Sequence, residues 1–215
     1  QVLDHYSREE VISYGKQVAW NQLWRNFCVS DTFEPGSPSK ILTVAAGLEE
    51  GILKGNEYFD CGGYLHVGDW DIKCTAYRRG GHGSLSLTES IMQSCNVAMM
   101  RIGAMMGRDI FTKYQTIFGM GQKTGVDLPG EADAAGLVYS ADKMGPTELA
   151  TNAFGQNYNC TMIQMAAALC SVINGGSYYE PHVVRQILNE QGSVVERKDP
   201  VLVRETVSQS TSDFL

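Results

Sequence analysis

The segment Glu34-Pro35-Gly36-Ser37-Pro38-Ser39-Lys40 constrains the fold of this chain more than any other part of its sequence. A Pro-Gly turn delivers a serine, and an unbroken helical pattern then continues to Gly51. Serine favours the N-cap of a helix and proline its first position, so we expect Ser37 to cap this helix and Pro38 to begin it. Lys40 lies three residues after Ser37, on the same helix face. The segment therefore predicts a serine nucleophile that faces a lysine base at a helix N-terminus.

The Ser-x-x-Lys spacing is a weak signal by itself, because the chain contains it three times. The three pairs are Ser13/Lys16, Ser37/Lys40 and Ser140/Lys143. Spacing alone is therefore equally compatible with an ordinary helix cap at Ser37. Ser13 is a poor candidate for a nucleophile, because it falls inside a predicted helix and no turn presents it.

Two capping-box patterns predict further helices. Residues 7–10 and 161–164 each carry a serine or threonine followed three positions later by glutamate or glutamine. The first pattern predicts a helix over residues 7–24. The second predicts an apolar helix over residues 161–174, which ends at a pair of glycines, as helices often do.

A further helical pattern starts at Ser86 and is interrupted by Ser94-Cys95-Asn96. Serine and asparagine compete with the backbone for hydrogen bonds, so such a tripeptide favours a helix end over a helix interior. We expect a helix, a short loop and a second helix, with Ser94 and Asn96 projecting from the loop. The chain has no other Ser-x-Asn pattern.

The segment from Cys61 to Cys74 is predicted to form a hairpin with Gly68-Asp69 as its two-residue turn. Its possible metal ligands fit no zinc spacing, so we expect neither a metal site nor a cofactor. These possible ligands are Cys61, His66, Asp69 and Cys74. A disulfide across the hairpin is geometrically possible in an oxidising compartment, although two free thiols are the favoured state.

The loop over residues 78–83 is basic and rich in glycine, and it contains His82. It matches no phosphate-binding pattern. We therefore expect His82 to be a loop residue rather than a catalytic base.

Composition excludes several classes of protein. The chain has 215 residues, of which 43% are hydrophobic, which predicts a globular protein of about one domain. A net charge of −7 argues against nucleic-acid binding. We expect no membrane segment, because no stretch approaches 18 consecutive apolar residues. The chain starts at Gln1 without a methionine, so we expect it to be an internal piece of a longer protein.

The two serine motifs occur together in a known family. A Ser-x-x-Lys at a helix start, followed roughly 55–60 residues later by Ser-x-Asn, is the pairing found in penicillin-interacting serine enzymes. The flanking sequences, residues 31–37 and 90–96, closely resemble class B penicillin-binding proteins, the monofunctional peptidoglycan transpeptidases. Three further segments share this resemblance: residues 124–131, 154–156 and 164–184. The cysteine-bearing hairpin resembles the division and sporulation branch of the family.

The resemblance implies an α/β (α+β) fold, the serine transpeptidase fold of penicillin-binding proteins and β-lactamases. It implies that residues 1–215 are an incomplete transpeptidase domain, mostly its helical part. The N-terminal anchor or pedestal and the strand with the family's Lys-Thr-Gly motif would lie outside the chain. Lys123-Thr124-Gly125 matches that motif in letters, but in the family its place belongs to a loop, so we do not expect it to be catalytic.

The resemblance also implies roles for four residues. Ser37 would attack the penultimate D-alanine carbonyl of a peptidoglycan stem peptide and form an acyl-enzyme, and Lys40 would take its proton. Ser94 would relay the proton to the leaving amine, and Asn96 would hold the substrate backbone. A lysine pKa of about 10.4 must be lowered for this role, by burial or by a neighbouring cation.

The partners implied by the resemblance are peptidoglycan stem peptides, β-lactam antibiotics and the cell-wall synthesis machinery. The implied location is the extracytoplasmic face of the bacterial cell membrane. Two alternatives stay open: a β-lactam hydrolase or sensor of the same superfamily, and a non-catalytic scaffold. Glu148 and Asn152 have the spacing of the water-activating loop of class A β-lactamases, but they lead into Phe154-Gly155-Gln156, which favours a penicillin-binding protein.

Overall fold

The computed structural model describes residues 7–215 and has a mixed α/β fold in which helices dominate. The helices are α1 (Arg8–Trp24), α2 (Phe27–Ser30), α3 (Lys40–Glu49), α4 (Leu87–Met92), α5 (Asn96–Ile117), α6 (Pro146–Asn152), α7 (Met162–Ile173) and α8 (Gln209–Phe214). The predicted fold class is confirmed.

The strands of the described residues form short antiparallel pairs rather than one large sheet. These pairs are β1 (Thr32–Phe33) with β6 (Cys160–Thr161), β2 (Tyr58–Cys61) with β5 (Gly83–Ser86), β3 (Tyr64–Val67) with β4 (Trp70–Lys73), β7 (Ser177–Tyr179) with β10 (Leu202–Glu205), and β8 (Gln186–Leu188) with β9 (Val194–Arg197). In the predicted hairpin Val67 pairs with Trp70, which places the turn at Gly68-Asp69 as expected.

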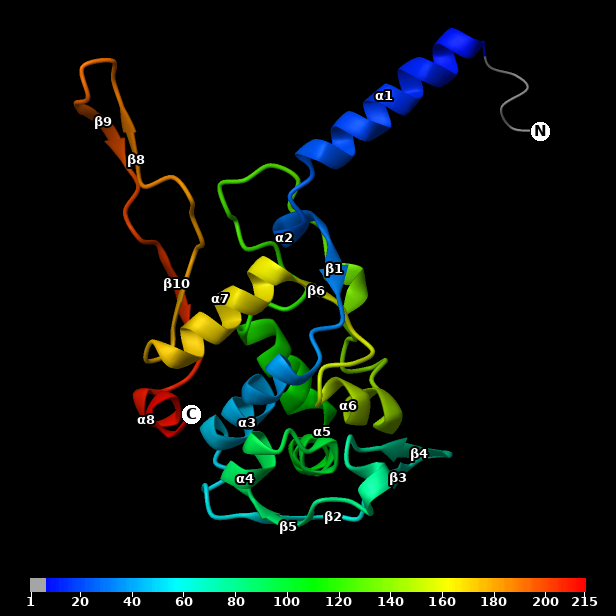
Figure 1. The fold of residues 1–215 in the computed structure, drawn as a ribbon. Helices are drawn as coiled ribbons and strands as arrows, with labels where there is room; N and C mark the ends of the chain where they lie inside the picture. Colours follow the sequence, from blue (N-terminus) through cyan, green and yellow to red (C-terminus); the bar gives the residue numbers. More distant parts are fainter. Residues whose placement is uncertain (1–6) are drawn as a thin grey trace.

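Helices α3 and α5 form the centre of the molecule, with α7 on one side and the β2–β5 pair on the other (Figure 1). Seven residues of α3 are buried, and the start of α5 is buried from Val97 to Met100. Gly103 lets α5 approach the end of α6 closely, because a Cβ at that position would lie 2.9 Å from the Cβ of Ala153. The helix that follows Ser37 is thus enclosed by packed neighbours.

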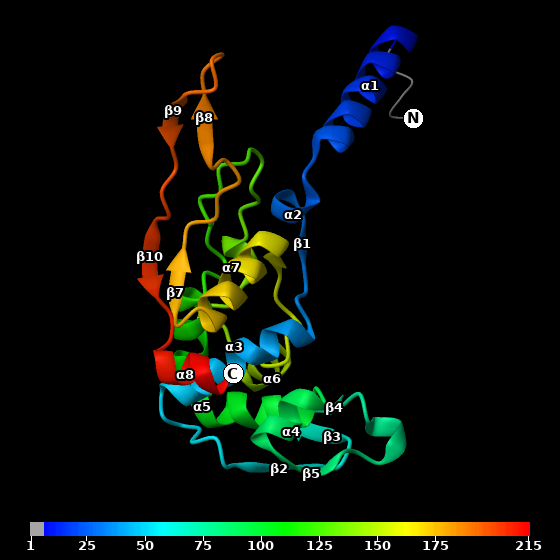
Figure 2. The same ribbon diagram turned by 60° about the vertical axis from the view of Figure 1, so that its left-hand side comes forward.

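Two elements project away from this body, and both still do so when the molecule is turned (Figures 1 and 2). One is α1, which has no buried residue. The other is the β8–β9 hairpin, in which every residue of β9 is exposed. Helix α1 nevertheless starts where the sequence predicts, because Ser7 and Glu10 form both hydrogen bonds of the capping box.

The second capping box is also confirmed, since Thr161 and Gln164 bond reciprocally at the start of α7. Within residues 7–215, no helix combines the length and the apolar character that a membrane span requires.

Candidate active site

The turn that carries Ser37 is formed by Gly36. This glycine has φ 62° and ψ −144°, a backbone conformation that is essentially restricted to glycine. A 3-10 turn, η2 (Ser37–Ser39), follows it, and α3 begins only at Lys40. The prediction that Ser37 caps the helix was therefore wrong, because Ser39 is the N-cap of α3 and Gly36 is the N-cap of the 3-10 turn. As a result the Ser37 hydroxyl is not used for capping and is exposed.

The segment Phe154-Gly155-Gln156 supports this turn from behind. Gly36 N–H donates to the Gly155 carbonyl at 2.7 Å. Gly155 has φ 89°, and a Cβ there would lie 2.0 Å from the Gly36 oxygen and 2.3 Å from Ser39 Oγ. Only glycine fits this close approach, so the segment has a positioning role that sequence reasoning did not assign to it.

Lys40 and Ser94 connect to Ser37 through a chain of hydrogen bonds. Lys40 Nζ donates to Ser94 Oγ at 2.8 Å, to the Ser94 carbonyl at 2.7 Å and to Asn96 Oδ1 at 2.7 Å. Three acceptors match the three protons of an ammonium group. Ser94 Oγ then donates to Ser37 Oγ at 3.0 Å. The structure thus brings together all four residues that the sequence singled out.

The environment of Lys40 changes its acidity in the direction that catalysis needs. Only 2% of the residue is exposed, and this burial lowers the pKa of its ammonium group below 10.5. Nearby Cys74 and Cys95 oppose the shift, because negative charge on their sulfurs favours the ammonium form. Of the two causes considered from sequence, burial is the one that lowers this pKa.

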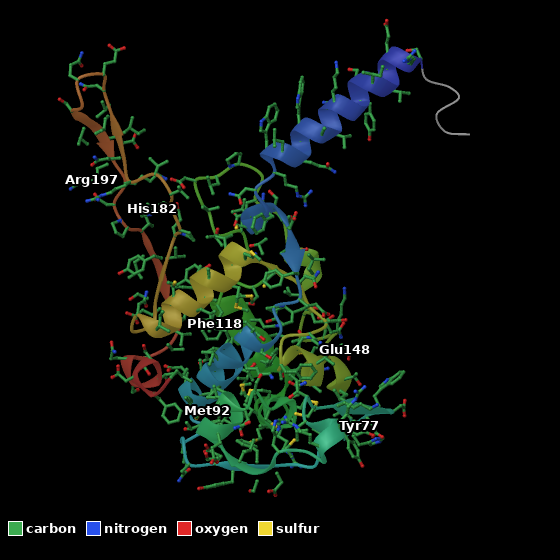
Figure 3. The ribbon with its side chains drawn as sticks, in the orientation of Figure 1. Tyr77, Met92, Phe118, Glu148, His182 and Arg197 are labelled. Carbon is green, nitrogen blue, oxygen red and sulfur yellow. The ribbon has the colours of Figure 1, made fainter. Side chains whose placement is uncertain are left out.

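Ser94 is held in an uncommon conformation. Its φ of 51° is left-handed, which costs of the order of 1–3 kcal/mol for a residue other than glycine. The turn is closed by the Ser94 N–H, which donates to Ile91, and by the Cys95 N–H, which donates to Ser90, both at 2.9 Å. The Cys95 side chain then caps α5, so Asn96 belongs to the first turn of that helix and not to the loop as expected. Met92, labelled in Figure 3, ends α4 two residues before Ser94.

The model for the penicillin binding protein transpeptidase domain matches residues 1–214 of this chain. The chain belongs to this family. Its resemblance to class B penicillin-binding proteins is thereby confirmed, and the family accounts for the pairing of the two serine motifs.

Similar proteins support this assignment. Stage V sporulation protein D of Bacillus subtilis (strain 168) is 37% identical over 191 residues, which are 87% of this chain and 29% of that protein. The chain thus spans less than a third of the length of this relative. Penicillin binding protein 3 from Mycobacterium tuberculosis, complexed with aztreonam, has a TM-score of 0.75 at 28% identity, covering 88% of this chain and 41% of the other.

A structure of the D,D-transpeptidase domain of a peptidoglycan glycosyltransferase from Eggerthella lenta has a TM-score of 0.80. The match covers 94% of this chain and 52% of that one. At 21% identity this likeness concerns the fold alone. The α/β arrangement around α3 and α5 is thus the transpeptidase fold of the family.

The segment Lys123-Thr124-Gly125 takes part in a different contact. The Thr124 hydroxyl and N–H both bind Glu131 Oε1, at 2.7 and 2.6 Å, and Gly125 N–H binds the other oxygen of this carboxylate at 3.3 Å. These hydrogen bonds hold residues 123–125 in the loop that ends at Glu131. This agrees with the prediction that the segment is a loop and not the catalytic Lys-Thr-Gly strand.

The alternative pair Glu148 and Asn152 lies on α6, where Figure 3 labels Glu148. Asn152 is buried, accepts a hydrogen bond from Gln115 at 3.1 Å and donates to the Gln156 carbonyl at 3.2 Å. Its amide therefore holds the loop that supports the Ser37 turn. This structural role gives no support to the hydrolase reading.

Of the four metal ligands considered from sequence, Cys61 and Cys74 lie in one group, and His66 and Asp69 are not part of it. His66 Nδ1 lies 2.8 Å from Asp71 Oδ1, and both side chains are exposed on the β3–β4 hairpin. Cys61 and Cys74 are free thiols, as favoured. They lie together with Cys95 and His82, and His82 is a loop residue, as expected.

Proposed function

We propose that this chain carries the nucleophile of a peptidoglycan D,D-transpeptidase, with Ser37 forming an acyl-enzyme. The observation that carries the proposal is the hydrogen-bond chain from Lys40 through Ser94 to Ser37. A serine needs an adjacent base to become a nucleophile, and this chain supplies both a base and a relay.

The first half-reaction begins when Lys40 has lost its ammonium proton. Its lone pair then accepts the Ser94 hydroxyl proton, and Ser94 Oγ takes the proton of Ser37 as Ser37 Oγ attacks the D-alanine carbonyl carbon. Ser37 is the first residue of a helical turn, so its N–H has no partner within that turn and can donate to the developing oxyanion. The proton returns through Ser94 to the leaving amine as the C–N bond breaks.

The second half-reaction transfers the acyl group. The amine of a second stem peptide attacks the Ser37 ester, Ser37 Oγ leaves and is reprotonated through Ser94, and a new peptide bond joins the two strands. The hydrogen bond from Asn96 Nδ2 to the Lys73 carbonyl is long, at 3.4 Å, and therefore weak. This amide is thus available to a substrate backbone.

The proposal includes the partners and the location of the protein. Its substrates would be stem peptides, and β-lactams would inhibit it covalently. It would act with the cell-wall synthesis machinery on the outer side of the cytoplasmic membrane. The aztreonam complex of the Mycobacterium tuberculosis relative supports the β-lactam assignment. A Lys-Thr-Gly strand encoded outside residues 1–215 would complete the site, since the Thr124-Gly125 pair is occupied elsewhere.

The test is labelling with a fluorescent penicillin followed by mass spectrometry of the labelled peptide. We expect one stable adduct, on Ser37. Rapid turnover of a chromogenic cephalosporin without a persistent adduct would instead identify a hydrolase. No adduct on any residue, in protein that carries the Lys-Thr-Gly strand, would leave only the scaffold interpretation.

A further inference from the structure

The basic, glycine-rich loop over residues 78–83 has no role in the proposed reaction, although it lies beside the active site. Residues 72–88 include three cations, Lys73, Arg78 and Arg79, and no acidic residue. The whole chain has a net charge of −7, so this concentration of positive charge is opposite in sign to the charge of the molecule. A local field of this sign attracts anionic ligands.

These three cations are exposed, and within residues 7–215 none of them forms an ion pair. Lys113, by contrast, is a cation that binds a carboxylate of the protein, that of Glu50. The unpaired groups keep their donors free for a ligand. Two of them are guanidinium groups, whose planar pairs of N–H donors match the two oxygens of a carboxylate.

Two exposed tyrosines lie beside these cations. The rings of Tyr64 and Tyr77 meet edge to face with their centroids 6.2 Å apart, and Lys73 Nζ lies 4.7 Å from the centre of the Tyr77 ring. Figure 3 labels Tyr77. A ligand at this place therefore meets cations and aromatic rings together. We call this set of side chains the basic-aromatic surface: Tyr64, Lys73, Tyr77, Arg78 and Arg79.

The backbone holds this surface in one conformation. The Ala76 carbonyl accepts hydrogen bonds from the N–H groups of Arg79, at 2.9 Å, and Gly81, at 3.1 Å. Gly81 has φ 102°, and a Cβ there would lie 2.0 Å from the Cys61 oxygen and 2.6 Å from the Gly63 nitrogen, so only glycine fits. Because the turn is already ordered, a ligand does not have to pay the entropic cost of ordering it.

The basic-aromatic surface continues into the active site through Lys73. The carbonyl of Lys73 accepts from Asn96 Nδ2, the amide that we propose to hold the substrate backbone, while its ammonium group lies over the aromatic ring. Burial lowers the pKa of the His82 imidazole, and the nearby charges of Arg79 and Lys40 lower it further. A cation of the surface and the proposed base thus lie close to the same ring.

We infer that the basic-aromatic surface binds carboxylates of a peptidoglycan stem peptide whose backbone lies along Asn96. The inference rests on the proposed function and deepens it, because it names an acidic peptide as the preferred substrate. Arg78 and Arg79 pair with the carboxylates, and the tyrosine rings cover the alkyl groups beside them. Binding is non-covalent. Since exposed ion pairs are weak, the surface provides selectivity for charge rather than tight binding.

The test uses the full-length protein with the substitution Ser37→Ala, so that binding is measured without acylation. Two synthetic stem peptides are compared, one with its internal carboxylates free and one with the same carboxylates amidated. We expect the acidic peptide to bind about 5–20-fold more tightly at low salt, as two exposed ion pairs allow. High salt should reduce this preference, because it screens exposed charges.

Variants show whether the preference comes from this surface. Arg78→Gln combined with Arg79→Gln should abolish the preference and leave binding of the amidated peptide unchanged. Arg197→Gln is the matched control, because Arg197 is an exposed, unpaired arginine within residues 7–215 and lies on the projecting β8–β9 hairpin (Figure 3). This variant should keep the full preference.

Two results overturn the inference: no preference for the acidic peptide in the protein with both arginines, or an undiminished preference in the double arginine variant. Labelling of Ser37 by fluorescent penicillin, in protein that keeps this serine, reports on the proposed function separately. Labelling without a charge preference removes only the role of the basic-aromatic surface. A charge preference without labelling removes the acyl-enzyme and leaves a peptide-binding surface.

Discussion

Helix α1 and the turn that leads into α3 both carry the pattern Ser-x-x-Lys, but only the second pair is hydrogen-bonded to a third side chain. Ser13 and Lys16 lie on α1, which projects from the body with no buried side chain. Ser37 and Lys40 lie at the start of α3, where Lys40 is buried and bound to Ser94. The comparison shows that spacing only places a hydroxyl and an amine near each other. Burial of the lysine and a third residue from the turn between α4 and α5 distinguish the pair that we propose to be catalytic.

The largest expected difference between the two helices concerns the nucleophile. Ser37→Ala should lower acylation by a fluorescent penicillin by about 10⁴-fold or more, because the variant lacks the attacking oxygen. Ser13→Ala should not change the rate. Gel fluorescence and intact-protein mass spectrometry measure the acylation rates of both variants. Labelling of the Ser37 variant at the parent rate would show that Ser37 is not the nucleophile.

Replacing the base should have the next largest effect. Lys40→Met should slow acylation by about 10²–10⁴-fold, the range that a general base contributes. The free energy of unfolding should change little, because the removal of a buried charge offsets the loss of the three hydrogen bonds that Lys40 donates. Lys16→Met is the matched control on α1, with no change expected in either quantity. Equal acylation rates in the two variants would remove Lys40 from the proposed mechanism.

The pH profile tests the environment of Lys40. Acylation should increase about tenfold per pH unit as the amine loses its proton, and level off at a midpoint below 10.5, since burial lowers this pKa. Between the folded and unfolded pKa values the unfolded chain binds more protons, so stability should rise with pH in that window. Lys40→Met should abolish this rise in a denaturation series. A kinetic midpoint at or above 10.5 would contradict the structure.

A smaller effect is expected from the glycine that supports the Ser37 turn. Gly155→Ala should cost about 3 kcal/mol or more, because φ is positive and the added Cβ meets Gly36 and Ser39. Gly192→Ala is a close control: φ is also positive, at 79°, but nothing lies within 4 Å of the added Cβ. It should cost about 1 kcal/mol, confined to the β8–β9 hairpin. Urea denaturation measures both, and equal costs would show that the contact behind Ser37 is unimportant.

The smallest difference concerns two capping boxes of the same type. Thr161→Ala, at a buried cap of α7, should lower the free energy of unfolding by about 1–2 kcal/mol. Ser7→Ala should fray the start of α1, seen by hydrogen exchange, without a change in melting temperature, because no residue of α1 is buried. An equal change in melting temperature would show that α1 is coupled to the body.

Several local features of this protein can be predicted from short stretches of its sequence. Capping boxes at Ser7 and Thr161, and the turn at Gly68-Asp69, depend on hydrogen bonds between residues a few positions apart, so their letters are sufficient to predict them. The pairing of Ser37/Lys40 with Ser94-x-Asn96 likewise predicted the family, because the two motifs are specific when they occur together.

Features that depend on residues far apart in the chain could be recognised only in the folded structure. The role of Gly36 at the cap becomes visible only with Gly155 packed behind it. The β2–β5 and β7–β10 pairs join segments whose pairing no local pattern signals. The strongest case is the group of Cys61, Cys74, His82 and Cys95, whose side chains meet from separate segments at spacings that match no zinc signature. Distance and burial set whether such groups act together, and both exist only once the chain has folded.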